Sequence, residues 1–148
     1  FRSEQLTIAE DEILLTGYTG SDKVIYVPDV YTIDGDEYKV KILSHIREKN
    51  YGLFEKNNVV EEIYLGNNVE GIDCSGGDIF NQGWKNNSLD RAFRADTSLR
   101  KVVVPSTVIH MDSTFAYCES LEEIDINSEN VTDVSYMLFN SNSIYILH

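Results

Sequence analysis

The repeat pattern of this chain is clearest in residues 93–111, FRADTSLRKVVVPSTVIHM. Apolar residues follow Phe93 at fixed intervals, six, nine and eleven positions later. The same three intervals follow Phe54 and Phe115, and the first two follow Leu138. Self-similarity with a period of about 20 to 50 residues is typical of stacked repeats, because one unit cannot bury its apolar face alone. The sequence therefore predicts a solenoid of stacked coils.

Alternating apolar residues at the end of each unit predict one short strand per coil. Such alternation places one face of a strand inward. The large residue that opens each unit then fills the interior from the opposite wall. An ordinary β-sandwich is the alternative, but a sandwich does not require the same intervals in every copy. The expected inward pairs are Ile25 and Val27, Ile63 and Leu65, Val102 and Val104, and Ile124 and Ile126.

If these strands stack in register, the residues beside the inward positions form columns across the sheet. Charges of opposite sign alternate down two of them, and neighbouring strands about 4.8 Å apart allow such pairs to attract. The third column makes Tyr26 and Tyr64 neighbours, which we interpret as a candidate ligand contact, with plain cross-strand packing as the alternative. The columns are Lys23, Glu61, Arg100 and Glu122; Val24, Glu62, Lys101 and Glu123; and Tyr26, Tyr64, Val103 and Asp125.

Three stretches carry a family resemblance. Residues 104–124, VPSTVIHMDSTFAYCESLEEI, resemble the repeats of BspA-like leucine-rich-repeat proteins, and residues 16–29 resemble the entry into their first repeat. Residues 130–138, NVTDVSYML, resemble a repeat of related bacterial surface proteins. The resemblance implies an α/β leucine-rich-repeat solenoid, β-rich and wound as a right-handed superhelix. It also implies a secreted or cell-surface protein, commonly bacterial and often an adhesin. It carries over no catalytic residues.

We expect a single domain over residues 1–148. Residues 1–22 contain two alternating apolar stretches, Leu6 with Ile8 and Ile13 with Leu15, and predict an N-terminal capping hairpin. Residues 23–148 then form about four coils. Asp34-Gly35-Asp36 predicts a hairpin turn. Calcium is the alternative there, but the remaining ligands and the spacing of an EF-hand loop are missing.

One unit is longer than the others. The interval from Phe54 to Phe93 is 39 residues, against 22 and 23 for the following intervals, so about 17 residues are inserted near residues 75–91. The insertion contains Trp84, the single tryptophan of the chain. Insertions in repeat proteins often form a binding face, so Trp84 is a candidate ligand-binding residue. Alternatively, it folds back and covers an exposed end of the core.

Composition restricts the partners. The chain has 12 basic and 25 acidic residues and a net charge of −13, which repels phosphate backbones, so we expect no nucleic-acid partner. No apolar run approaches the roughly 20 residues that span a bilayer, so we expect no membrane insertion. The last unit stops within its strand at Leu147-His148, which favours a fragment of a longer repeat protein.

The residues that carry chemistry form no known catalytic or metal pattern. His45, His110 and His148 fall in different coils, and no hydrolase, metalloprotease or phosphate-loop motif is present. Cys118 occupies a repeat position and is interpreted as a small packed residue. We therefore expect no enzyme, cofactor or metal, but a recognition module that binds a host or neighbouring-cell protein or glycan. The alternative is a structural spacer of a larger surface protein.

Overall fold

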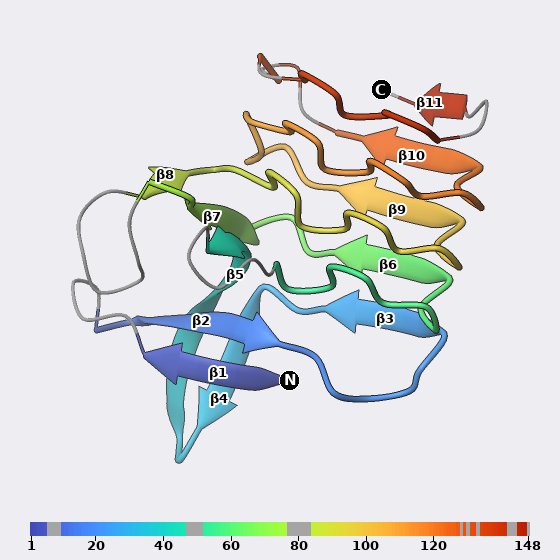
Figure 1. Cartoon of the computed structure of the whole chain (residues 1–148). Coiled ribbons are helices and arrows are strands. Elements are labelled where there is room, and N and C mark those ends of the chain that lie inside the picture. Colours follow the sequence, from blue (N-terminus) through green and yellow to red (C-terminus); the bar gives the residue numbers. More distant parts are fainter. Residues whose placement is uncertain are drawn as a thin grey trace.

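The structure is a computed structural model, and it describes residues 1–5, 10–46, 52–76, 84–127, 129, 131–132, 134–141 and 145–147. These residues form two β-sheets (Figure 1). One is a five-stranded sheet whose paired strands all run parallel. The other is a six-stranded sheet that mixes parallel and antiparallel pairs. In Figure 1 the parallel strands lie one above another on the right, and the mixed sheet lies mostly on the left.

The parallel sheet has the order β11-β10-β9-β6-β3. Its strands pair with the register that the sequence predicted, so Ile25 faces Ile63, Ile63 faces Val102 and Val102 faces Ile124. The same register confirms the predicted columns that begin at Val24 and Tyr26. In the column that begins at Lys23, Arg100 Nη1 lies 3.5 Å from a carboxylate oxygen of Glu122. The strands are β3 (Val24–Val27), β6 (Glu62–Leu65), β9 (Lys101–Val104), β10 (Glu123–Ile126) and β11 (Tyr145–Leu147).

The predicted inward residues of β3, β6, β9 and β10 are buried, and aromatic rings fill the core opposite them. Phe54, Phe93 and Phe115 are almost completely buried and stack on one another, with ring centroids 5.8 and 5.6 Å apart. Offset stacking of this kind stabilises a core beyond the area that it buries. The prediction that these phenylalanines fill the interior is therefore confirmed.

The mixed sheet has the order β1-β2-β5-β7-β8, and β4 also pairs with β5. Three of its pairs are antiparallel, β1 with β2, β4 with β5 and β7 with β8, whereas β2 and β7 run parallel to β5. Its strands are β1 (Arg2–Gln5), β2 (Glu12–Gly17), β4 (Val30–Ile33), β5 (Asp36–Ile46), β7 (Glu70–Cys74) and β8 (Lys85–Asn86).

The antiparallel pairs of this mixed sheet include the predicted hairpin turn. Asp34 and Gly35 connect β4 to β5 with φ angles of 52° and 87°, the left-handed conformation that a two-residue hairpin turn requires. The predicted turn is therefore confirmed. Near the N-terminus, β1 and β2 pair antiparallel. Leu6 and Ile8, which predicted the first strand of the N-terminal hairpin, lie outside the described residues.

The predicted α/β leucine-rich-repeat solenoid is wrong. Among the described residues there is no helix, and the mixed sheet, with its three antiparallel pairs, is not part of any coil. The segments between the parallel strands contain turns with positive φ, at Arg91 and Ala95 and again at Ser113 and Tyr117. A left-handed residue at every fourth position interrupts any α-helical run. The chain is a small β-rich domain built from two sheets, and the described part holds no helix able to cross a membrane.

Candidate functional site

The two predicted tyrosines lie side by side on the outer face of the parallel sheet. Tyr26 on β3 is paired in register with Tyr64 on β6, and their rings stack with centroids 4.8 Å apart and an interplanar angle of 14°. Because Ile25 and Val27 point into the core, Tyr26 points to solvent and is 70% exposed. The register of two short strands is therefore what brings these rings together.

Charged neighbours hold the ring of Tyr64. Its hydroxyl donates a 2.9 Å hydrogen bond to Glu62 Oε1, and the ammonium of Lys101 lies 5.5 Å from the centroid of its ring. Lys101 Nζ also lies 3.1 Å from a carboxylate oxygen of Glu123. The hydrogen bond to Glu62, together with some burial, raises the pKa of Tyr64, and the pairing with Glu123 raises the pKa of Lys101. The phenol therefore stays a donor and the lysine stays a cation at neutral pH.

We call Tyr26, Tyr64, Glu62 and Lys101 the tyrosine face. Tyr64 has a neighbour on each side of its ring, Tyr26 on one and Lys101 on the other. Tyr26 lies on β3, at the edge of the parallel sheet (Figure 1), so its second ring face is left open. An exposed ring held in place by a second ring is a preorganised stacking surface for a sugar or an apolar side chain.

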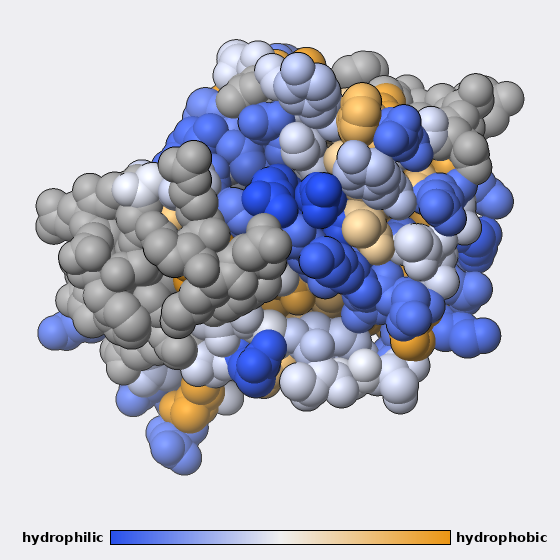
Figure 2. All heavy atoms as spheres, viewed as in Figure 1, coloured by the Kyte–Doolittle hydropathy of each residue, from blue (hydrophilic) through white to orange (hydrophobic). Residues whose placement is uncertain are grey.

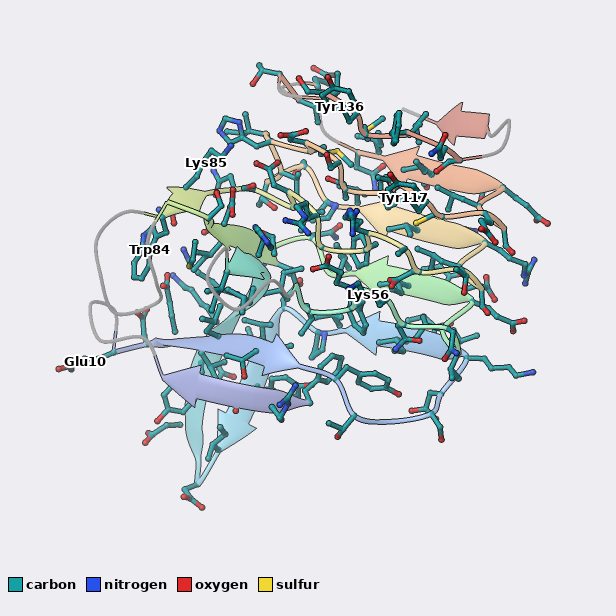
Figure 3. All side chains as sticks on the ribbon, viewed as in Figure 1. Glu10, Lys56, Trp84, Lys85, Tyr117 and Tyr136 are labelled. Carbon is teal, nitrogen blue, oxygen red and sulfur yellow. The ribbon has the colours of Figure 1, made fainter. Side chains whose placement is uncertain are left out.

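Trp84 lies elsewhere, directly before β8 in the mixed sheet (Figure 3). It is half-buried and packs against a small apolar cluster on that sheet, separate from the main core. Residues 77–83 of the predicted insertion around it lie outside the described residues. The structure thus does not bring Trp84 together with the tyrosines, and its role in binding stays a prediction. The cluster consists of Leu14, Leu43, Ile46, Ile72 and Cys74.

Sequence reasoning missed how Glu62 and Lys101 support Tyr64, because it assigned both only to a ladder of charges. The predicted columns contained the necessary signal, since Lys101 stands diagonally beside Tyr64 on the next strand. Diagonal neighbours in a sheet lie within reach of long side chains.

A second group of exposed aromatic residues was also missed. Tyr117 and Tyr136 each pack edge-on against Phe139, and the guanidinium of Arg94 lies 5.0 Å from the centroid of the Tyr117 ring. Figure 3 shows Tyr117 and Tyr136 on the turn segments, not on a strand. The surrounding face is mostly hydrophilic, with isolated hydrophobic residues (Figure 2). The positive φ of Tyr117 and Tyr136, which aims them outward, has no simple signature in the sequence.

The candidate nucleophiles are buried. Both cysteines are buried inside the protein. Burial raises the pKa of Cys118 to about 12, and its sulfur donates to the carbonyl oxygen of Phe93, at 3.1 Å. A thiol in this state is not a nucleophile at neutral pH. Across the part of the chain that is described, no group of three histidine, cysteine or carboxylate side chains is placed to hold a metal ion.

The chain was compared with known proteins in three ways. No family model matches the sequence, and neither a curated protein nor a solved structure gives a significant match. The resemblance to BspA-like proteins therefore stays a prediction, and the function is argued from the residues of this chain alone.

Proposed function

We propose that this chain is a non-catalytic recognition module of the cell surface or the extracellular space, and that it binds a protein or glycan through the tyrosine face. The observation that carries the proposal is the stacked pair of Tyr26 and Tyr64, with Tyr26 70% exposed at the sheet edge. A rigid aromatic side chain loses little conformational entropy on binding, and such residues dominate the energetics of many interfaces.

The polar neighbours of the rings add hydrogen-bonding capacity. Glu62 and Lys101 flank Tyr64 and are only partly exposed, so they border the stacking surface without covering Tyr26. An aromatic platform with charged groups at its rim suits a ligand with both apolar and hydroxyl or amide groups, as glycans and protein surfaces have.

The experiment is a binding screen of the native chain against glycan and matrix-protein arrays, repeated with Tyr26→Ala. We expect the native chain to bind at least one ligand and the variant to bind it at least about tenfold more weakly, as for an interface hot spot. The matched control is Tyr136→Ala, since Tyr136 is also 70% exposed but lies on a turn segment. Trp84→Ala tests whether the insertion contributes.

Three results would contradict the proposal or part of it. Equal losses for Tyr26→Ala and Tyr136→Ala would remove the tyrosine face as the site. Retained binding by Trp84→Ala would remove the insertion as a contact. A native chain that binds nothing on either array would favour the alternative, a structural spacer in a larger surface protein.

A further inference from the structure

A polar cavity opens beside the mixed sheet, away from the tyrosine face. Its volume is about 370 Å³, and its walls come from the strands β5, β7 and β8 and from the turn segments after β7, β8 and β9. Three of its side chains, His45, Asp73 and Asp90, are more than nine-tenths buried. The wall carries both signs of charge, from Asp73, Asp90, Asp112, Lys85 and Arg91.

Both cations of the wall are engaged by other groups. Lys85 Nζ lies 2.7 Å from Asp90 Oδ2. One terminal nitrogen of Arg91 lies 3.0 Å from Glu55 Oε1, and the other lies 2.8 Å from Nε2 of His45. The Glu55 side chain is only 2% exposed, so its pairing with Arg91 is shielded from solvent. These pairs hold both cations of the wall in place.

Two carboxylates of the wall have no such partner. Asp73 accepts hydrogen bonds from the backbone N–H and the hydroxyl of Ser75, at 2.9 and 3.0 Å. Asp112 accepts one from the Ser113 hydroxyl, at 3.1 Å. Among the described residues, no cationic nitrogen lies within 4.0 Å of either carboxylate.

The wall therefore holds an excess of negative charge. Burial is the main cause that raises the pKa of Asp73, and the charge of the neighbouring Asp90 carboxyl, to which Asp73 is also hydrogen-bonded, raises it further. The ionised form of Asp73 is therefore disfavoured while no cation lies beside it. A positively charged guest would relieve this repulsion, and ion pairs shielded from solvent are stronger than exposed ones.

We propose that this cavity binds an organic ammonium group, with the carboxylates of Asp73 and Asp112 as its acceptors. A primary ammonium has three N–H donors and needs several oxygen acceptors around it. The cavity is much larger than a single water molecule requires, so it has room for the carbon chain that carries the ammonium. This site lies on the mixed sheet and recognises charge instead of ring faces, so it does not depend on the proposed role of the tyrosine face.

The test measures binding of n-butylammonium and of N-acetyl-lysine amide to the native chain, by calorimetry and by the fluorescence of Trp84. Trp84 is the single tryptophan and directly precedes Lys85 in the cavity wall. The first probe represents a free amine and the second a lysine side chain of a protein partner. The uncharged controls are 1-butanol and N-acetyl-lysine amide acetylated on its side chain. We expect only the charged probes to bind, and more weakly in high salt.

The variant is Asp112→Asn, which removes one charge and keeps the side-chain shape. Asp112 is only half-buried, and its backbone N–H, which donates to Asp90 Oδ1 at 2.7 Å, is unchanged by the substitution. We expect the variant to bind the ammonium probes at least about tenfold more weakly, because a charge-assisted hydrogen bond is lost. Asp125→Asn is the matched control, because it removes the same charge from the outer face of β10.

Several outcomes would overturn the proposal. One is equal binding of the charged and uncharged probes, which would indicate apolar partitioning. Another is equal weakening by Asp112→Asn and Asp125→Asn, which would indicate attraction by the net charge alone. A third is binding of Ca²⁺ without any binding of the two ammonium probes. Failure of the Tyr26→Ala experiment affects none of these measurements.

Discussion

The carboxyl group of Asp96 is buried in the core with one oxygen unpaired among the described residues. Asp96 is completely buried, and its Oδ1 accepts a 2.8 Å hydrogen bond from the backbone N–H of Asn57. Its Oδ2 has no partner in the described structure. Burial raises its pKa well above the ordinary value, and the nearby Glu55 adds to the effect. Asp96 therefore binds a proton more tightly in the folded protein than in the unfolded chain.

This environment predicts a pH-dependent stability that Asp96→Asn removes. The pKa of Asp96 is higher in the folded than in the unfolded chain. The contribution of Asp96 to the free energy of unfolding is therefore fully present below the pKa that it has in the unfolded chain. This contribution is lost as pH rises through the pKa that Asp96 has in the folded protein. At neutral pH the asparagine variant should be more stable by about 1 to 3 kcal/mol. Urea unfolding from acidic to neutral pH measures the difference, with Asp125→Asn as the control. A variant that is less stable at neutral pH would show that Asp96 has a cationic partner in solution.

The turn segments opposite the parallel sheet are held by a ladder of backbone hydrogen bonds. Phe54 and Lys56 donate to the carbonyl oxygens of Ala92 and Arg94, at 3.2 and 2.9 Å. Phe93 likewise donates to the carbonyl oxygen of Thr114, at 3.2 Å. Each rung satisfies polar groups that a helix would have satisfied internally. These turns can therefore replace helices while the stacked phenylalanine rings stay in line.

The left-handed positions in these turns cost conformational energy. Ala95 has a φ of 59° and a β-carbon, whereas glycine adopts this conformation without strain. We expect Ala95→Gly to stabilise the protein by about 0.5 to 1 kcal/mol, despite the greater flexibility of glycine in the unfolded chain.

Ala92→Gly is the matched control in the same turn segment. Ala92 is completely buried and has no positive φ, so losing its methyl group should destabilise the protein. Thermal unfolding of the two variants measures both effects. Equal destabilisation by both substitutions would mean that the turn holds Ala95 without strain.

The whole molecule has two apolar cores of very different size. The main core lies between the sheets and receives Ile13, Leu15 and Ile42 from the mixed sheet. The small cluster lies on the opposite face of the mixed sheet, where Leu14 and Leu43 alternate with those residues, and Trp84 packs against it. A cluster of few buried residues opens at lower free energy than the main core.

The two cysteines report on this difference, because Cys74 lies in the small cluster and Cys118 in the main core. We expect a thiol reagent in dilute urea to label Cys74 before Cys118, at urea concentrations below the global unfolding transition. The variants Cys74→Ser and Cys118→Ser each keep a single cysteine, so each variant gives the labelling rate of the remaining thiol. If both thiols react at the same rate, the molecule unfolds as one cooperative unit.

Part of this structure follows from local pattern alone. The intervals after Phe54, Phe93 and Phe115 predicted the register of the parallel strands, and with it the neighbourhood of Tyr26 and Tyr64. Alternation with a period of two already separates the two faces of a strand, so an in-register stack aligns equal positions. The continuous apolar run Ile13-Leu14-Leu15 also indicated that β2 is buried on both faces. One of these faces is the surface against which Trp84 packs.

The connecting segments and the polar cavity beside the mixed sheet were decided only by tertiary structure. The prediction of helices failed because left-handed turns such as those at Arg91 and Ala95 depend on hydrogen bonds between segments, which no local pattern shows. Asp73 and Asp112 line one cavity although 39 residues separate them in the sequence. The sequence shows that each of these residues is acidic. Their position in one cavity depends on how the two sheets and their turn segments pack together.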